Sequence, residues 1–218
     1  MPEKTVQKEP GKKPAPSKKP KPQQEVVVQI PLSELHPFPE HPFQVREDAS
    51  MQETAESVKE YGVLVPALAR PREDGGYELI AGHRRKHACE LAGLTTMPVI
   101  VRNIDRDAAI IIMVDSNLQR ENILPSERAK AYKMKMEAIK RQGARTDLTS
   151  PKISAKFRSD DEVGQDAGVS GDTIRNYIAL TQLVPELQQM VDEKKIGMTP
   201  AVEISYLKPE EQHILSIS

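Results

Sequence analysis

The 218-residue sequence lacks tryptophan and contains only three phenylalanines, five tyrosines and one cysteine. So few aromatic residues argue against an all-β sandwich and favour a helix-rich core. A single cysteine, Cys89, excludes an internal disulfide and a cysteine-based zinc site. No apolar run reaches about 18 residues, and the first residues lack the apolar stretch of a signal peptide. We therefore expect a cytoplasmic protein with no membrane partner.

Basic charge and proline are concentrated at the N-terminus. Residues 1–24 hold seven lysines, two glutamates and six prolines, a net charge of +5, while the remaining 194 residues carry a net charge of −6. The segment has too little apolar surface to offset its ordering entropy, so we expect residues 1–24 to form a disordered Lys/Pro-rich tail. Its charge favours loose attraction to DNA or to an acidic partner. A solubilising leader without specific contacts is the alternative.

Residues 25–122 alternate between strand and helix patterns, which is typical of a compact α/β domain. A β-rich run begins the segment, and an apolar strand pattern over 97–101 follows the second helix. The patterns predict a helix from Ser50, as N-cap, to a stop at Gly62, two strands around the Asp74-Gly75 turn, and a helix between Gly82 and Gly93.

Residues 123–218 read as a helical domain. A helix after Asp105 leads into it, and Pro125 and Gly143 mark the start and stop of another helix. Ala167, Gly168, Val169 and Ser170 then supply the turn chemistry of a helix-turn-helix, with Ser170 capping the second helix. The overall prediction is an α+β chain in which a small mixed α/β domain precedes an all-helical domain.

The N-terminal part of this second helix carries side chains suited to reading DNA bases, because arginine and asparagine can make bidentate contacts to guanine and adenine. An ordinary helical hairpin is the alternative, and the five acidic residues among 160–172 oppose DNA binding. Lys152, Lys156 and Arg158 would then have to supply much of the phosphate contact. The predicted DNA-binding residues are Lys152, Ser170, Gly171, Thr173, Arg175 and Asn176.

The sequence GHRR, residues 82–85, places cations at a helix N-terminus, where acidic side chains are normally favoured. A strand, a glycine and a helix start together present free backbone N–H groups to an anion, and arginine forks suit phosphate. A solvated helix end is the alternative. Two further clusters, in PFQVR and SNLQRE, make a converging phosphate pocket credible. The predicted nucleotide-binding residues are Gln44, Arg46, Gly82, His83, Arg84, Arg85, Asn117, Arg120 and Glu121, with Asn117 also a candidate Mg²⁺ ligand.

Five motifs in this order resemble the ParB/Spo0J/Noc family of partition proteins over roughly residues 26–215: PFQVR, YGVLVPALAR, GHRRKHACELAG, NLQRENILPSERA and the helix-turn-helix. The resemblance implies an N-terminal domain of the ParB/sulfiredoxin-like fold that binds CTP and Mg²⁺. It also implies a helix-turn-helix domain that binds a palindromic, centromere-like site on double-stranded DNA as a homodimer. Nucleotide binding would close the dimer into a clamp that slides along DNA, in a nucleoid- or plasmid-associated protein.

Two positions depart from the family pattern. His83 replaces the glutamate of the family's GERR motif, and Ser116 replaces a glutamate in its ENxQR motif. A carboxylate binds Mg²⁺ and accepts a proton, whereas neutral histidine is a poor ligand for this hard ion. The resemblance therefore implies nucleotide binding with slow or absent hydrolysis, at most a weak CTPase.

Other functions remain open from the sequence. A small nucleotide-dependent phosphotransferase of the same core fold is one alternative, and a transcriptional regulator that ignores nucleotides is another. Sulfiredoxin-like enzymes carry a catalytic cysteine where this sequence has His83, so we expect Cys89 to be a buried core residue instead. By resemblance, the tail of residues 1–24 would contact a ParA-type ATPase.

Overall fold

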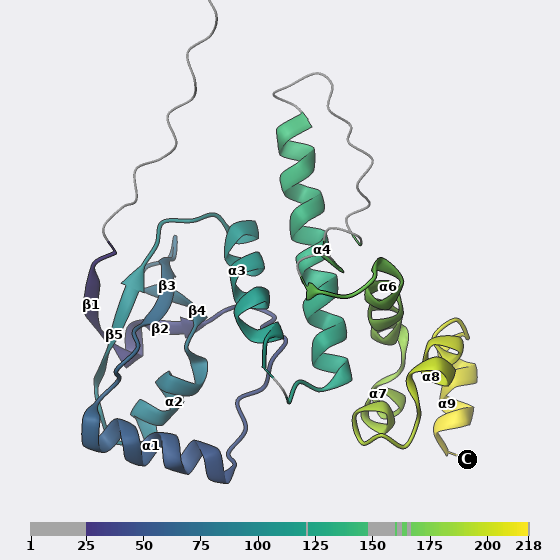
Figure 1. The fold of residues 1–218 in the computed structure, drawn as a ribbon, viewed down its shortest axis with the longest axis horizontal. Coiled ribbons are helices and arrows are strands. Elements are labelled where there is room, and N and C mark those ends of the chain that lie inside the picture. The colour runs from purple at the N-terminus through teal and green to yellow at the C-terminus, as the bar shows by residue number, and fades with distance from the viewer. Residues whose placement is uncertain (1–24, 121, 148–159, 161–162, 165–166, 218) are drawn as a thin grey trace, which may run out of the picture.

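The computed structural model describes residues 25–120, 122–147, 160, 163–164 and 167–217. The predicted tail, Lys152 and Glu121 lie outside these residues. A mixed α/β part and a helical part lie on opposite sides of one long helix, α4 (Figure 1). The predicted fold class, a mixed α/β domain followed by a helical region, is confirmed.

A five-stranded mixed sheet forms the frame of the α/β part, in the order β1-β5-β3-β4-β2. Strands β1 and β5 are antiparallel, as are β3 and β4, whereas β3 pairs with β5 and β2 with β4 in parallel. A 3₁₀ turn at Leu32–Glu34 connects β1 to β2. The strand bounds are β1 Val27–Pro31, β2 Leu35–Pro37, β3 Ala67–Pro71, β4 Tyr77–Ala81 and β5 Thr96–Val101.

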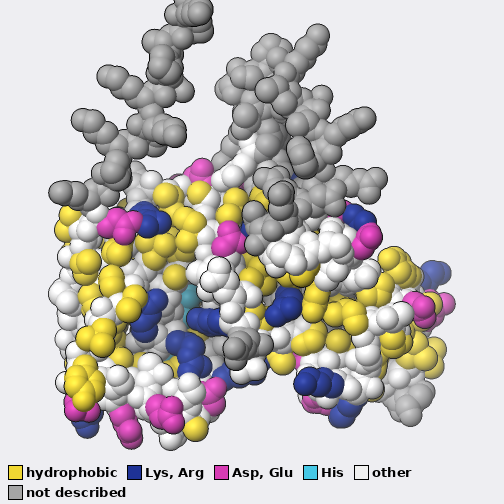
Figure 2. All heavy atoms as spheres, in the orientation of Figure 1, with side chains coloured by type: hydrophobic (Ala, Val, Ile, Leu, Met, Phe, Trp, Pro, Cys, Tyr) yellow, Lys and Arg dark blue, Asp and Glu magenta, His cyan; other side chains and the backbone are white. Residues whose placement is uncertain are grey.

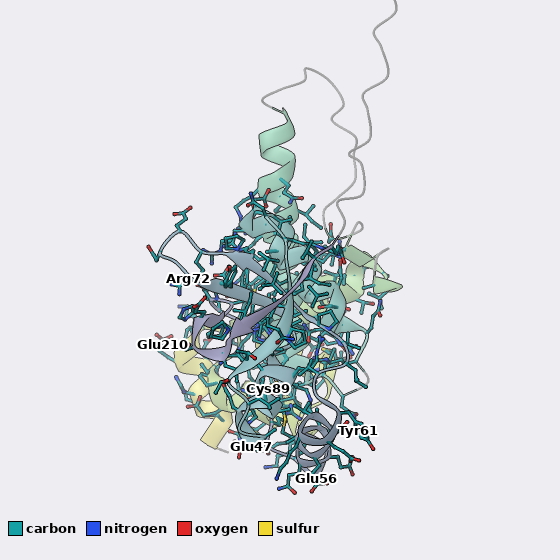
Figure 3. All side chains as sticks on the ribbon, turned by 90° about the vertical axis from the view of Figure 1, so that its left-hand side faces the viewer. Glu47, Glu56, Tyr61, Arg72, Cys89 and Glu210 are labelled. Carbon is teal, nitrogen blue, oxygen red and sulfur yellow. The ribbon has the colours of Figure 1, made fainter. Side chains whose placement is uncertain are left out.

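Helices cover both faces of this sheet, because successive side chains of a strand point to opposite faces. Leu79 of β4 packs with α1 (Ala49–Tyr61) and α2 (His83–Leu91), whereas its neighbour Ile80 packs with α3 (Arg106–Leu118). Cys89 lies in the first of these cores and is fully buried, as predicted (Figure 3).

The start of α1 differs from the sequence prediction. Asp48, not Ser50, is the N-cap: its carboxylate accepts a hydrogen bond of 2.9 Å from the backbone N–H of Met51. The helix therefore begins at Ala49, before the expected capping residue. Its predicted end is correct, because Gly62 adopts a φ of 73° and closes the helix with a bond to the carbonyl of Val58.

Helix α4 spans Pro125–Asp147 and is shared by the two parts of the chain. Its Ala131 and Ala138 pack with α3 in the core beneath the sheet, whereas Ala129 and Tyr132 pack with the helical part. The stop predicted at Gly143 is wrong, since the helix continues for another turn. One glycine in a helix interior costs only about 1 kcal/mol, so it does not force the helix to end.

The helical part contains the predicted turn. Gly168 adopts a φ of 68°, and the Ser170 hydroxyl accepts a hydrogen bond from the Thr173 N–H at the start of α6. Gly164 packs so closely that a Cβ there would lie 2.6 Å from the Val169 carbonyl oxygen. The elements that follow are α6 Gly171–Ala179, a 3₁₀ turn at Leu180–Gln182, α7 Pro185–Asp192, α8 Met198–Ile204 and α9 Pro209–Ile217.

Candidate functional site

The glycine of the GHRR motif is required by the backbone. Gly82 is the N-cap of α2 with a φ of 112°, and a Cβ at this position would lie 2.8 Å from the Cβ of Ala67. Any other residue would therefore be both strained and too close to β3. The first turn of α2 contains no acidic residue, so the positive end of the helix is not neutralised locally.

The three residues after Gly82 point in three directions, because successive helix residues are rotated by roughly 100°. The His83 ring packs against the His41 ring, with 3.9 Å between their centroids. Arg84 turns toward Ser50 and Asp48, at 3.3 Å and 3.6 Å. Arg85 instead donates hydrogen bonds to the carbonyl oxygens of Val65 and Pro66, at 2.5 Å and 2.7 Å.

A cavity of about 550 Å³, the arginine cavity, lies between the loop after β2, α2 and the segment joining α3 to α4. Three distant stretches of sequence meet there, and they contribute Gln44, Arg46, Arg84 and Arg120. Figure 2 shows basic side chains gathered in this central, hollowed region of the surface. The full lining is Phe43, Gln44, Arg46, Asp48, Ser50, Arg84, Gln119, Arg120, Asn122, Ile123 and Glu127.

The arginine cavity is electrostatically suited to a polyanion. Three guanidinium groups face two carboxylates, those of Asp48 and Glu127. Burial lowers the pKa of Arg120, and the positive charge of Arg84 lowers it further. Because these two cations repel each other in a partly desolvated space, an anion bound between them would lower the energy of both.

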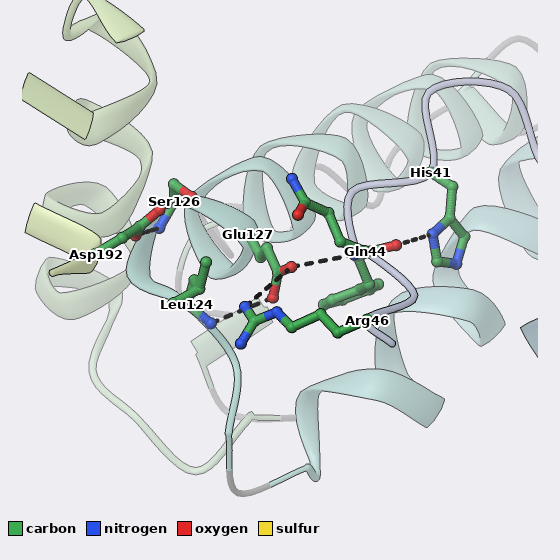
Figure 4. Close-up of polar contacts among 8 residues, drawn as sticks. His41, Gln44, Arg46, Leu124, Ser126, Glu127 and Asp192 are labelled. Atoms are coloured by element: carbon green, nitrogen blue, oxygen red, sulfur yellow. Dashed lines mark hydrogen bonds and ion pairs between the residues drawn. The ribbon is translucent and has the colours of Figure 1, made fainter. Parts of the chain in front are cut away.

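Glu127 supports the arginine cavity from behind, and sequence reasoning missed it. Its buried carboxylate accepts hydrogen bonds from the backbone N–H groups of Gln44, at 3.1 Å, and Leu124, at 3.2 Å, and lies 3.7 Å from Arg46 (Figure 4). One side chain thereby fixes the loop after β2 to the start of α4. An acidic residue two positions after the predicted N1 proline is the sequence feature that could have drawn attention to it.

The same end of α4 is attached to the helical part. Both the backbone N–H and the hydroxyl of Ser126 donate to the carboxylate of Asp192, at 2.9 Å and 2.6 Å (Figure 4). Asp192 is the last residue of α7. Two adjacent residues, Ser126 and Glu127, therefore connect the arginine cavity to the helix-turn-helix region.

The two packed histidine rings, His41 and His83, are tilted by 48° and lie next to the loop that Glu127 holds. His41 Nδ1 lies 2.7 Å from the Phe43 carbonyl oxygen, to which it donates, so the histidine pair is joined to the loop. Burial, and then the neighbouring His41, lower the pKa of His83 to about 3, and burial also lowers the pKa of His41. Both rings are therefore neutral near pH 7, and neither belongs to the lining of the arginine cavity.

Asn117, the predicted Mg²⁺ ligand, is buried and donates from Nδ2 to the Met113 carbonyl oxygen at 2.7 Å within its own helix. It does not line the arginine cavity. Within residues 25–217 as far as they are described, no group of three His, Cys, Asp or Glu side chains is arranged to hold a metal ion. The hydrogen-bond donors of the arginine cavity, its three arginines and Gln44, fit a nucleotide polyphosphate. An accompanying Mg²⁺ would be coordinated by phosphate oxygens and water.

A larger cavity, of about 950 Å³, lies near the β3–β4 turn and the start of α3. Its lining holds four carboxylates and three arginines. Arg70 forms an ion pair of 2.5 Å with Glu78, and Arg72 lies 3.7 Å from Asp74. Because carboxylates outnumber guanidinium groups here, whereas the reverse holds in the arginine cavity, the arginine cavity is the better anion site.

The helix-turn-helix residues occupy the predicted positions around the start of α6. Ser170, Arg175 and Asn176 are exposed, Thr173 is half-buried, and Gly171, the first residue of α6, is buried. Arg175 is not free, because its guanidinium pairs with both Asp160 and Asp172. Two of the five acidic residues among 160–172 therefore contact the arginine that was predicted to read a base.

Comparison with known families agrees with the order of these parts. Residues 16–118 match the model of the ParB N-terminal domain, and residues 151–217 match that of the ParB HTH domain. The chain belongs to the ParB family. Helix α4, which connects the cavity to the helix-turn-helix region, lies entirely between the two matched segments. Across the part of the chain that the structure describes, no helix is long and apolar enough to cross a membrane.

Relatives in this family include a chromosome-partitioning protein, Spo0J, of Thermus thermophilus, which is 34% identical over 85% of this chain. The stage 0 sporulation protein J of Bacillus subtilis is 32% identical over 80% of the chain. The chain spans 62% and 56% of the lengths of these two proteins. They establish the kinship of the matched segments.

Two solved structures share the fold. A C-terminally truncated ParB from Caulobacter crescentus, complexed to the centromeric parS site, gives a TM-score of 0.53 at 24% identity, with 87% of this chain and 98% of that one covered. A Pnob8-like ParB-N domain gives a TM-score of 0.59 at 17% identity, with 89% and 90% covered.

Proposed function

We propose that the chain is the nucleotide- and DNA-binding part of a partition protein, in which CTP bound in the arginine cavity controls a homodimeric clamp on DNA. The main support for this proposal is that Arg46, Arg84 and Arg120 converge on one cavity. Bidentate guanidinium groups recognise phosphate oxygens, and the unneutralised start of α2 adds a favourable dipole. The choice of CTP over other nucleotides, and the accompanying Mg²⁺, follow from the family.

The DNA-binding step is assigned to the helix-turn-helix domain, with α6 entering the major groove of a palindromic duplex. Kinship with chromosome-partitioning proteins supports this assignment. Ser126 and Glu127 supply a direct physical route between the two sites, because a shift of the loop after β2 on nucleotide binding would move the start of α4 and, through Asp192, α7.

Hydrolysis of the bound nucleotide should be slow. His83 is neutral, packs against His41 and does not line the cavity, while the Ser116 hydroxyl donates to the Met113 carbonyl within α3. Neither side chain is placed to activate water. A steady-state phosphate-release assay with preferred DNA should therefore give little turnover, and rapid CTP turnover would contradict the assignment.

Calorimetric titration with the four nucleoside triphosphates, with and without a DNA duplex, tests the proposal as a whole. We expect binding that is selective for CTP and strengthened by magnesium, without turnover of a small molecule. Binding of no nucleotide, together with site-specific DNA binding, would instead identify a plain regulator. Transfer of phosphate to a small acceptor would identify a phosphotransferase.

A further inference from the structure

The recognition arginine of α6 is held by two carboxylates with very different environments. Asp160 contacts Arg175 Nη1, and Asp172 contacts Nη2. The side chain of Asp160 is only 13% exposed, whereas that of Asp172 is 80% exposed. We propose that Asp160 is a positioning residue that aims Arg175 at a base, and that Asp172 is a specificity residue that DNA must displace. The proposal rests on the assignment of α6 as the DNA-reading helix.

Asp160 should keep its contact when DNA binds. Asp160 is far less exposed than Asp172, so water screens its contact with Arg175 less, and this contact is the harder of the two to break. Arginine has five N–H donors in a rigid fork, so a guanidinium held on one side still has donors for a guanine edge. A partner that fixes the orientation of the fork also reduces the side-chain entropy lost on binding.

Asp172 should give up its contact. Its carboxylate stands in solvent, so the ion pair with Arg175 is weak and exchanges easily. On non-specific DNA, Asp172 remains beside the phosphates and repels them. On the preferred duplex, Arg175 gains a bidentate base contact that outweighs the lost pair, and Asp172 can accept a hydrogen bond from a cytosine amino group. Asp172 therefore penalises wrong sequences more than right ones.

The test compares Asp160→Asn with Asp172→Asn, which remove the same charge from the same guanidinium. Binding is measured by fluorescence anisotropy on the preferred duplex, selected from a random palindromic library with the wild-type chain, and on a scrambled duplex of equal length. If no preferred duplex is recovered, the assignment of site-specific DNA binding fails. If one is recovered, the two variants decide the present proposal.

We expect opposite effects. Asp172→Asn should strengthen binding to the scrambled duplex about threefold and change the preferred duplex less, so discrimination falls. Asp160→Asn should weaken the preferred duplex about tenfold while changing the scrambled duplex by less than about threefold. Both effects should disappear in an Arg175→Ala background. Glu203→Gln, at an exposed carboxylate on α8, controls for net charge.

Several results would overturn the proposal. Equal strengthening of both duplexes by the two variants would show that only net charge matters. An Asp160→Asn loss that persists without Arg175 would show a purely structural role. If Asp172→Asn leaves the discrimination between the two duplexes unchanged, Asp172 is not a specificity residue. If circular dichroism shows that Asp160→Asn does not fold, Asp172→Asn, measured alone and together with Arg175→Ala, still tests the proposal. In that case, unchanged discrimination between the two duplexes in Asp172→Asn rejects the proposal.

Discussion

Two helices in this chain carry arginines toward an expected polyanion, and the net charge around these arginines differs in sign between the two. At α2, Arg84 shares a cavity with Arg46 and Arg120, so guanidinium groups outnumber carboxylates. At α6, Arg175 is paired with two carboxylates, and no other basic side chain of α6 accompanies it. An excess of positive charge favours tight binding of a small polyphosphate, whereas a neutralised arginine favours discrimination over affinity.

The difference agrees with the ligands expected at the two sites. A nucleotide presents all its charge in one cavity and must be held in a fixed orientation. DNA offers phosphates everywhere, so an uncompensated recognition helix would bind any sequence.

Loss of the cavity arginines should have the largest effect. The double substitution Arg84→Ala and Arg120→Ala removes two charge-assisted contacts to phosphate and should weaken nucleotide binding at least about 100-fold, as measured by calorimetry. DNA binding measured without nucleotide should change little. Arg106→Ala is the matched control, because Arg106 is exposed and lines the charge-compensated cavity instead. Wild-type nucleotide affinity in the double variant would place the polyphosphate elsewhere.

Glu127→Ala should lower the free energy of unfolding by about 2 kcal/mol, because two backbone N–H groups lose their acceptor. Urea denaturation measures this change. Nucleotide affinity should also fall, although the substitution removes a negative charge from the cavity, since Gln44 and Arg46 lose their support. Glu137→Ala, at an exposed ion pair of α4, should be nearly neutral. A rise in nucleotide affinity would show that Glu127 acts as a competing anion.

Much of this fold could be predicted from the sequence because local patterns and tertiary packing agree. The helix ending at Gly62 and the turn at Gly168 need a positive φ, which glycine adopts without strain. The start of α1 was misplaced because Asp48 and Ser50 are both good caps, and only the packed chain selects one. Gly143 does not end α4, because a glycine permits a helix stop but does not force it.

The convergence of Arg46, Arg84 and Arg120 was predicted from the residue types and the family resemblance. The residues that each arginine contacts could not be predicted in this way. Arg85 looks like Arg84 in sequence, yet one helical position turns it toward the carbonyls of Val65 and Pro66. Glu127 lies 83 residues from Gln44, and no local pattern records so distant a contact.

Ser170→Ala should destabilise the helical part of the chain and leave the arginine cavity unchanged. The hydroxyl caps α6, and its loss should lower the free energy of unfolding of the helical part by about 1 kcal/mol. Hydrogen exchange of α6 amides measures the change locally, while nucleotide affinity should stay at the wild-type value. Ser170→Asn keeps a capping acceptor and should restore most of the stability. Equal exchange in all three proteins would show that the cap contributes nothing.

The smallest expected effect is a pH dependence of stability that comes from the α/β part, since α6 contains no histidine whereas His41 and His83 pack together near the arginine cavity. The pKa of His83 is about 3 in the folded chain, below its ordinary value of 6.5, so the unfolded chain takes up a proton first as pH falls. The stability is complete well above pH 6.5 and declines between pH 6.5 and about 3. From pH 7 to pH 6, this residue should lower the free energy of unfolding by about 0.7 kcal/mol. His83→Asn should remove that part of the slope in urea titrations, whereas His213→Asn, at an exposed histidine of α9, leaves the histidine pair intact and serves as the control. A slope unchanged by His83→Asn would mean that the histidine pair accepts protons in the folded protein.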